Sequence, residues 1–205
     1  MDILPILLVP IVVAAVIAFA VMSQKRLLPF KRLAEANGWA YRWLPVEGFE
    51  ISGTAGGVAW TLHHGRRESV GFEARFQADF RPGVVFGVID KARYTALKDS
   101  FLVASRMLTR VHLSVHSVAG LVTGPTIPPP AGLQARFVVL GDLTHAAILS
   151  DEIIRQLQSM SGPLAVMIYD GKLQIEASPI ERAELLTSLP KFVSLGQLLL
   201  QQRRP

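Results

Sequence analysis

The chain has 205 residues, of which 50% are hydrophobic and none is cysteine, so a disulfide scaffold and a thiolate metal site are excluded. The formal net charge is +5, but six basic residues lie near the two ends of the chain, at Lys25, Arg26, Lys31, Arg32, Arg203 and Arg204. Without these residues and Asp2 the two signs balance, so we expect neither the basic face of a nucleic-acid binder nor a nucleic-acid partner.

Residues 3–22 form an apolar run without a charged side chain. At about 1.5 Å rise per residue, a helix of this length matches the roughly 30 Å hydrocarbon core of a bilayer. Pro5 and Pro10 do not exclude this helix, since membrane helices tolerate proline. The run therefore predicts a transmembrane anchor over residues 1–23. The alternative is a cleaved signal peptide, which the absent basic n-region and the length of the run disfavour.

Four basic residues follow the apolar run directly, and only Met1 and Asp2 precede it. Because cytoplasmic flanks carry the lysine and arginine excess, this asymmetry predicts a single-pass protein of a bacterial inner membrane, with its N-terminus outside and its soluble domain cytoplasmic. The same residues would contact anionic lipid of the bilayer, or would serve only as topology determinants. They are Lys25, Arg26, Lys31 and Arg32.

The next segments predict a basic juxtamembrane helix over residues 24–38, broken or restarted at Pro29, and a β-rich region over 39–123. Strand patterns at 39–44, 49–53, 58–63, 72–80 and 84–89 indicate an antiparallel sheet of about four or five strands. Gly56-Gly57 marks a hairpin turn between two of them. A helix is expected at 91–110, followed by a further strand at 111–115.

A Pro/Gly linker or loop at residues 124–132 precedes an expected α+β module over 133–205. Its pattern is β-α-β-β-α, with Asp142 and Ser150 as helix caps and Asp170-Gly171 as a hairpin turn. Ser178 is placed to cap a helix, and Pro190 to begin another. The predicted fold class is thus α+β, with an N-terminal transmembrane helix, an antiparallel-sheet region and the C-terminal module.

The C-terminal third of the chain resembles an uncharacterised family of bacterial membrane-anchored proteins of unknown function. The resemblance is carried by residues 137–142, by apolar positions in the two segments that follow, and by residues 170–173. It implies a fold and an anchored location, and it implies no activity. The chain departs from the family in having one apparent span where such proteins often have two.

Histidine is the usual general base and a common metal ligand near neutral pH. His63, His64 and His112 are the candidate catalytic residues, although no motif of a known enzyme class accompanies them. On a strand, His112 and His116 would lie about 13 Å apart, too far to bind one ion; a helix would suit a metal, but the alternation favours a strand. The candidate acidic partners Asp79, Asp90, Asp99 and Asp142 follow strands or cap helices. We predict no metal site and no cofactor.

The sequence favours an interaction or scaffold module that binds a membrane or cytoplasmic protein, because an anchor and a neutral body accompany no catalytic constellation. A membrane-tethered, hydrolase-like enzyme that uses histidine and aspartate is the alternative. A third possibility is a lipid or small apolar ligand bound between the β-rich half and the helices, which would need a large apolar pocket.

Overall fold

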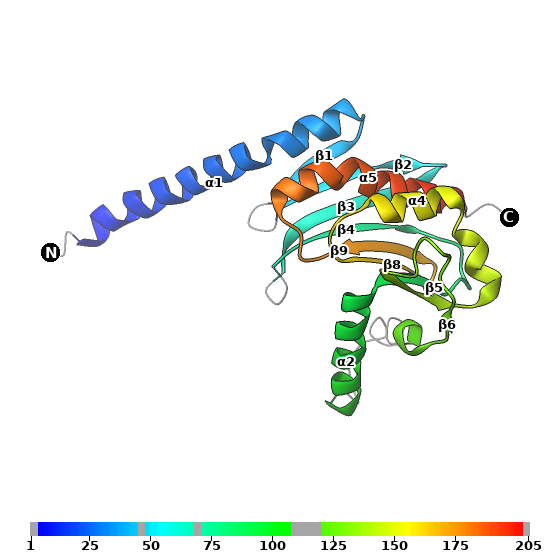
Figure 1. The fold of residues 1–205 in the computed structure, drawn as a ribbon. Coiled ribbons are helices and arrows are strands. Elements are labelled where there is room, and N and C mark those ends of the chain that lie inside the picture. Colours follow the sequence, from blue (N-terminus) through cyan, green and yellow to red (C-terminus); the bar gives the residue numbers. More distant parts are fainter. Residues whose placement is uncertain (1–3, 45–47, 68–70, 108–119, 203–205) are drawn as a thin grey trace.

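The computed structural model of the protein describes residues 4–44, 48–67, 71–107 and 120–202. Within these ranges the chain forms one sheet with helices on both of its faces (Figure 1). The sheet order is β1-β2-β3-β4-β9-β8-β5-β7-β6, and every neighbouring pair is antiparallel. The strands are β1 Ala40–Leu44, β2 Gly48–Ala55, β3 Val58–Arg67, β4 Gly71–Asp79, β5 Phe86–Asp90, β6 Thr126–Ile127, β7 Phe137–Gly141, β8 Leu164–Tyr169 and β9 Lys172–Ala177.

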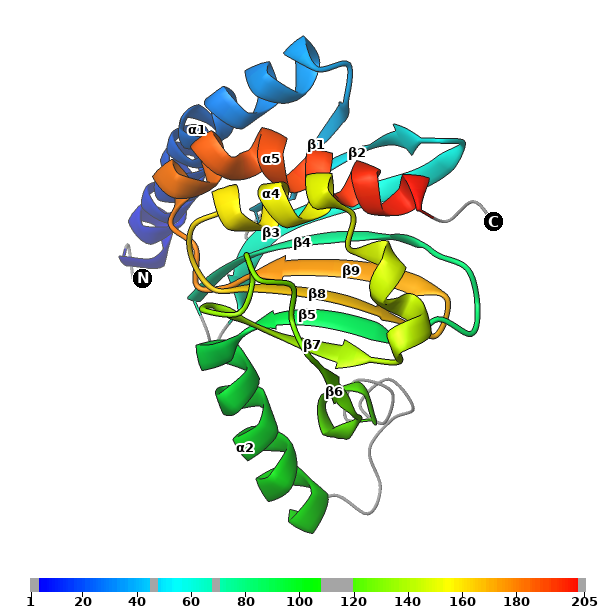
Figure 2. The same ribbon diagram turned by 45° about the vertical axis from the view of Figure 1, so that its right-hand side comes forward.

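Two views of the ribbon show α4, α5 and the end of α1 over one face of the sheet, while α2 extends from the other side (Figure 2). The N-terminal half of α1 reaches away from the rest of the molecule. The helices are α1 Leu4–Ala36, α2 Lys91–Met107, the 3₁₀ helix η1 Leu143–Ile148, α4 Asp151–Ser159 and α5 Arg182–Gln201.

Period-two alternation in the strands separates two apolar clusters, one on each face of the sheet. The larger lies under α1, α4 and α5 and contains fully buried rings such as Phe49, Trp60 and Phe76. The smaller lies on the opposite face, where Ile89 and Met167 pack with partly buried residues of α2. The helices therefore cover one face broadly and the other only in part.

The predicted transmembrane helix is wrong, and with it the predicted single-pass membrane location. Among the residues that the structure describes, no helix combines the length and the apolar character that crossing a bilayer requires. The apolar run forms the first half of α1, a continuous 33-residue helix that passes through Pro29 without a break. Its last turns bury Leu27, Phe30 and Ala34 against the sheet. An apolar run of this length looks the same in sequence whether or not the helix spans a membrane.

The predicted fold class is also wrong in how it divides the chain after α1. β5 comes from the first half of the chain, yet it lies between β8 and β7 of the second half. Pairs such as Ala74 with Ala177 join β4 to β9 across the whole sequence. Local patterns cannot reveal such long-range pairing, so the sequence suggested a sheet region and a separate module where the structure has one nine-stranded antiparallel sheet.

Both predicted hairpin turns are confirmed. Ala55 pairs with Val58 around Gly56 and Gly57, and both glycines have positive φ. Tyr169 pairs with Lys172 around Asp170 and Gly171, which have φ of 50° and 69°. A two-residue turn with positive φ at both positions matches the right-handed twist of the strands, which explains why Gly-Gly and Asp-Gly stand there.

The helix caps agree with the predictions in two cases and differ in a third. The Asp142 side chain accepts a hydrogen bond from the Thr144 amide at the start of η1, and Ser150 caps α4. The helix expected from Ser178 begins later, at Arg182, and its N-cap residue makes no side-chain cap bond. No second helix begins at Pro190, which lies inside α5.

The two edges of the sheet differ. β1 is a five-residue edge strand, whereas β6 at the other edge has only two residues. Pro128, Pro129 and Pro130 follow β6 directly. Proline has no backbone N–H, so this segment cannot donate ladder hydrogen bonds to another strand.

Candidate functional site

One register row crosses the sheet from β1 to β7 on the face opposite α4 and α5. Its side chains are charged or polar over the first five strands and apolar over the last three. In order they are Arg42, Glu50, His63, Arg75, Glu176, Ala165, Ile89 and Val138. This face is therefore divided into a polar half on β1–β4 and β9 and an apolar half, against which α2 packs.

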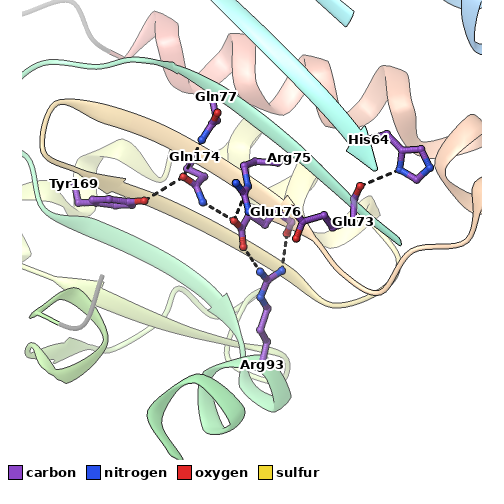
Figure 3. A network of polar contacts seen from close by, with 8 residues as sticks. All are labelled: His64, Glu73, Arg75, Gln77, Arg93, Tyr169, Gln174 and Glu176. Atoms are coloured by element: carbon purple, nitrogen blue, oxygen red, sulfur yellow. Dashed lines mark hydrogen bonds and ion pairs between the residues drawn. The ribbon is translucent and has the colours of Figure 1, made fainter. Parts of the chain in front are cut away.

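Glu176 is the centre of a polar network at the border between these halves (Figure 3). Its carboxylate is ion-paired with Arg75 at 3.0 Å, and with Arg93 from the first turns of α2. Arg93 also donates to the backbone carbonyl of Glu176. Arg75 forms a second ion pair with Glu73 at 2.9 Å. Since Glu73 and Glu176 are both buried, these pairs compensate two carboxylates that have little contact with water.

Amide and phenol groups extend the network along β9. Gln174 donates to Glu176 and accepts hydrogen bonds from Gln77 and from the Tyr169 hydroxyl. Burial raises the pKa of the Tyr169 phenol, and the negative charge of Glu176 acts in the same direction. Burial lowers the pKa of Arg93, and its interaction with Glu176 opposes that shift. The charges of this surface are thus largely satisfied within the chain.

The exposed apolar surface is concentrated on α1. Five of the seven large hydrophobic residues found exposed in the described part of the chain belong to this helix. They belong to α1, whose N-terminal half reaches away from the sheet in Figure 1. These residues, which we call the α1 stripe, are Val13 at 51%, Ile17 at 58%, Val21 at 46%, Met22 at 54% and Leu28 at 41% exposure.

The basic residues predicted to contact lipid lie at the end of the α1 stripe nearest the sheet. All four are exposed, and Lys31 forms an i,i+4 ion pair with Glu35 at 3.8 Å. Their contact with lipid stays a prediction. They are Lys25, Arg26, Lys31 and Arg32.

The two candidate histidines that the structure describes do not form a common site. His63 and His64 are consecutive residues of β3, so their side chains point to opposite faces of the sheet. His63 belongs to the polar half, whereas His64 is fully buried beneath α1. His112 and His116 lie outside the described residues, as does the strand expected at 111–115.

Three of the aspartates considered as partners for a catalytic histidine have structural contacts, and Asp99 lies exposed on α2. Asp90 accepts from the Ala92 amide at the start of α2 and pairs with Arg136 at 3.1 Å. Asp79 pairs with Lys172, and Asp142 caps η1. No group of three or more His, Asp or Glu side chains in the described ranges could hold a metal ion.

Sequence reasoning missed most of the polar network. The alternation of β4 marked residues 73–79 as a strand with one wet face, which was a usable signal for Glu73 and Arg75. Nothing local indicated that Arg93 of α2 would reach Glu176 of β9, because the contact depends on long-range strand pairing. In the sequence, the residues of the α1 stripe are not distinguished from the longer apolar run that contains them.

The fold and these surfaces define an α+β protein with one antiparallel sheet and an apolar helical arm. No known family model matches the chain, and no curated protein matches its sequence. Among solved structures, the chain is similar to the crystal structure of the mycobacterial trehalose monomycolate transport factor A, TtfA. The match has 11% sequence identity and a TM-score of 0.47, and it covers 89% of this chain and 96% of TtfA. At this level of similarity we transfer no function from it.

Proposed function

We propose that the chain is an interaction module that binds another protein through the α1 stripe. The observation that carries this proposal is the concentration of exposed apolar side chains on an arm that extends from the sheet. Contiguous exposed apolar patches mark binding surfaces, because leaving them in water is unfavourable. By contrast, the charged groups of the polar half pair mainly with one another.

The composition of α1 defines the chemistry of the partner. From Val13 to Leu28 the stripe extends about 22 Å at the helical rise, a length suited to an apolar groove. Residues 3–24 contain no charge, so the groove should be uncharged where it meets them. Lys25, Arg26 and Arg32 are exposed beside its end. We therefore expect a partner whose apolar groove has an acidic rim at one end.

A photo-crosslinker placed at residue 17 tests the proposal directly in native cells. Ile17 is 58% exposed, so p-benzoylphenylalanine at this position should not disturb the fold. The expected result is a discrete protein adduct that is absent when the same group replaces Leu143, which is 69% exposed and belongs to η1. Equal crosslinking from both positions, or the absence of any protein adduct from residue 17, would contradict the proposal.

Substitution of the stripe provides a second test on the partner thus identified. Replacing Val13, Ile17 and Val21 with serine removes apolar contact area, and each well-buried side chain contributes about 1.5–3 kcal/mol. We expect affinity to fall at least tenfold, with an unchanged circular dichroism spectrum. The matched variant Val85→Ser/Leu143→Ser alters the two other exposed hydrophobic residues, and it should bind as the wild type does.

Lipid contact through the same part of α1 is a second candidate function. It is favoured by the four basic residues beside the stripe, each of which could contribute about 1 kcal/mol at an anionic surface. Core side chains such as Phe76 and Phe192 fill the space between the sheet and α5, so we place lipid contact on α1 and not in that space.

Co-sedimentation with phosphatidylserine vesicles tests lipid contact. Replacing Lys25, Arg26, Lys31 and Arg32 with glutamine should weaken binding, and 0.5 M salt should reduce wild-type binding similarly by screening. Equal sedimentation of the wild type and the variant at low salt would contradict an electrostatic contact. A lipid adduct in place of a protein adduct in the residue 17 experiment would favour this candidate over a protein partner.

A further inference from the structure

His64 lies inside a cluster of aromatic rings that joins α1 to the sheet. Its ring centroid is 5.1 Å from that of Phe49, 5.5 Å from that of Phe72 and 6.2 Å from that of Phe30. The Phe30 ring of α1 in turn lies 4.6 Å from the Phe49 ring of β2, tilted by 30° to it. The imidazole is fully buried, so its environment depends on Phe30 remaining in place.

The hydrogen bonds of the ring fix a neutral tautomer. Nδ1 lies 2.9 Å from the backbone carbonyl of Glu73, which can only accept, so Nδ1 carries the proton. Nε2 has no hydrogen-bond partner among the residues that the structure describes. A proton added at Nε2 would therefore create a buried cation without a hydrogen bond to stabilise it.

The charged groups around the cluster also disfavour such a cation. From α5, the Arg182 guanidinium lies 4.8 Å above the Phe72 ring. Neighbouring Glu50, His63 and Glu73 belong to the opposite face of the sheet, where Glu50 pairs with Arg42 and Glu73 with Arg75. On α1, the charged residues nearest Phe30 are exposed: Arg26, Lys31, Arg32 and Glu35.

These surroundings have a measurable electrostatic effect. Burial lowers the pKa of His64 from 6.5 to about 4, and the positive charges of Arg182 and His63 contribute to the decrease, against the hydrogen bond to Glu73. A ring released into water returns toward the ordinary histidine value. The released form therefore binds protons in a pH range where the docked form does not.

The docking of α1 depends on few contacts. Among the α1 residues whose side chains the structure describes, Leu27, Phe30 and Ala34 are buried and Leu33 is partly buried beside them. Phe30 is the member of this set that covers His64. Movement of this short segment would expose the imidazole while the strands remained paired.

We propose that protonation of His64 releases the docked end of α1 from the sheet, so that the position of the arm depends on pH. Above about pH 6.5 both states are neutral at this residue and docking does not change with pH. Below pH 6.5 the ratio of released to docked α1 grows about tenfold per pH unit, until the docked form also binds the proton near pH 4. Between these two values the ratio changes about 300-fold in total. The device is independent of the partner that the α1 stripe binds.

Because the 205-residue chain has no cysteine, spin labels at two introduced cysteines can measure the movement of α1 relative to the sheet. Spin labels at Val21→Cys on α1 and Lys172→Cys on β9, both exposed, report the distance between helix and sheet. We expect a narrow distribution at pH 7.5 and a growing second population between pH 6.5 and 4.5. Circular dichroism in the same range checks that the sheet remains folded.

Three variants separate His64 from other titrating groups. His64→Phe keeps an aromatic ring but cannot bind a proton, so its distribution should not change with pH. His64→Gln provides a second non-titrating side chain if the phenylalanine variant does not fold. His63→Gln alters the adjacent histidine on the other face and should retain the wild-type response. An unchanged wild-type distribution down to pH 4.5, or the same response in either His64 variant, would overturn the proposal.

Discussion

A single glycine of α5 allows this helix to approach the sheet closely. A Cβ on Gly196 would lie 2.4 Å from Cζ of Phe76, far inside van der Waals contact. Replacing a helical glycine with alanine normally gains about 1 kcal/mol, but overpacking a filled core costs about 1–3 kcal/mol. Because Phe76 is fully buried and cannot move into solvent, the cost should dominate, and we expect Gly196→Ala to lower the free energy of unfolding by up to about 2 kcal/mol in urea titrations.

Gly120 provides the matched control for that experiment. It lies in the helical turn of residues 120–123, and a Cβ there would meet nothing within 4 Å. Gly120→Ala should therefore be neutral or stabilising by less than about 1 kcal/mol. If Gly196→Ala were equally well tolerated, the close packing of α5 on Phe76 would be wrong.

At the scale of residues, the sequence revealed positions whose role is local. Gly57 and Gly171 mark their turns because both turn positions need positive φ, and Ser150 caps the helix that it immediately precedes. The sequence did not show which of His63 and His64 is buried. Alternation places the two side chains on opposite faces of the strand, but it does not tell which face the helices cover. The unpartnered Nε2 of His64 became visible only with Phe30 in place.

Among the elements, α2 is held to the polar half of the sheet by Arg93. Arg93→Met would remove both of its bonds to Glu176, a buried carboxylate that would keep Arg75 as an ion-pair partner. We expect a loss of about 1–3 kcal/mol in the free energy of unfolding, together with faster amide hydrogen exchange in the first turns of α2.

The ion pair between Arg42 and Glu50 supplies the comparison. It lies on the same face, but the Arg42 side chain is 66% exposed, and exposed pairs contribute about 0–1 kcal/mol. Arg42→Met should therefore change stability little and leave exchange in α2 unaltered. Equal effects of the two substitutions would rule out a special role for Arg93 in holding α2.

A proline lies inside α5 without ending the helix. Pro190 cannot donate the backbone hydrogen bond that would normally reach the carbonyl of Leu186 four residues earlier, and such a proline costs roughly 3 kcal/mol in an ordinary helix. We expect Pro190→Ala to raise the midpoint of thermal unfolding. A lower midpoint would indicate that the bend introduced by proline is needed for packing on the core.

Prolines account for two element boundaries that the sequence misplaced. Pro29 and Pro190 were expected to break or begin helices, yet α1 and α5 pass through both. Packing can override this signal. Leu27 and Phe30 are buried on either side of Pro29, and Leu189 and Phe192 on either side of Pro190, so tertiary contacts hold the helix where the local preference would interrupt it.

At the scale of the whole molecule, the strand order makes the two halves of the chain interdependent. Residues 39–123 produced alone would leave β4 without β9, and β5 without its neighbours β8 and β7. We expect this fragment and the fragment 133–205 each to lack cooperative unfolding and to show poorly dispersed NMR spectra. Co-expression should restore a folded complex. A sharp thermal transition in either isolated fragment would contradict this expectation.

The same strand order explains why the arrangement of the strands in the sheet could not be predicted from the sequence. Most strands were located within a few residues, because alternation and turn residues are local signals. Their order was not, since pairs such as Phe76 with Ile175 depend on packing between distant segments. The apolar run of α1 led to the opposite error, because it was a strong local signal from which membrane spanning was inferred.

The unequal edges of the sheet limit how the protein can assemble by adding strands. At β6, two residues and a run of prolines give an incoming strand little to pair with. At β1, five residues run along the border of the sheet, and the charge of Arg42 is directed to Glu50 within the same chain. Each copy has one receptive edge, β1, so two copies that pair through β1 leave no such edge free. Among the strands that the structure describes, growth through β1 therefore closes at a dimer, because the short, proline-flanked β6 edge offers little pairing for an open-ended fibre.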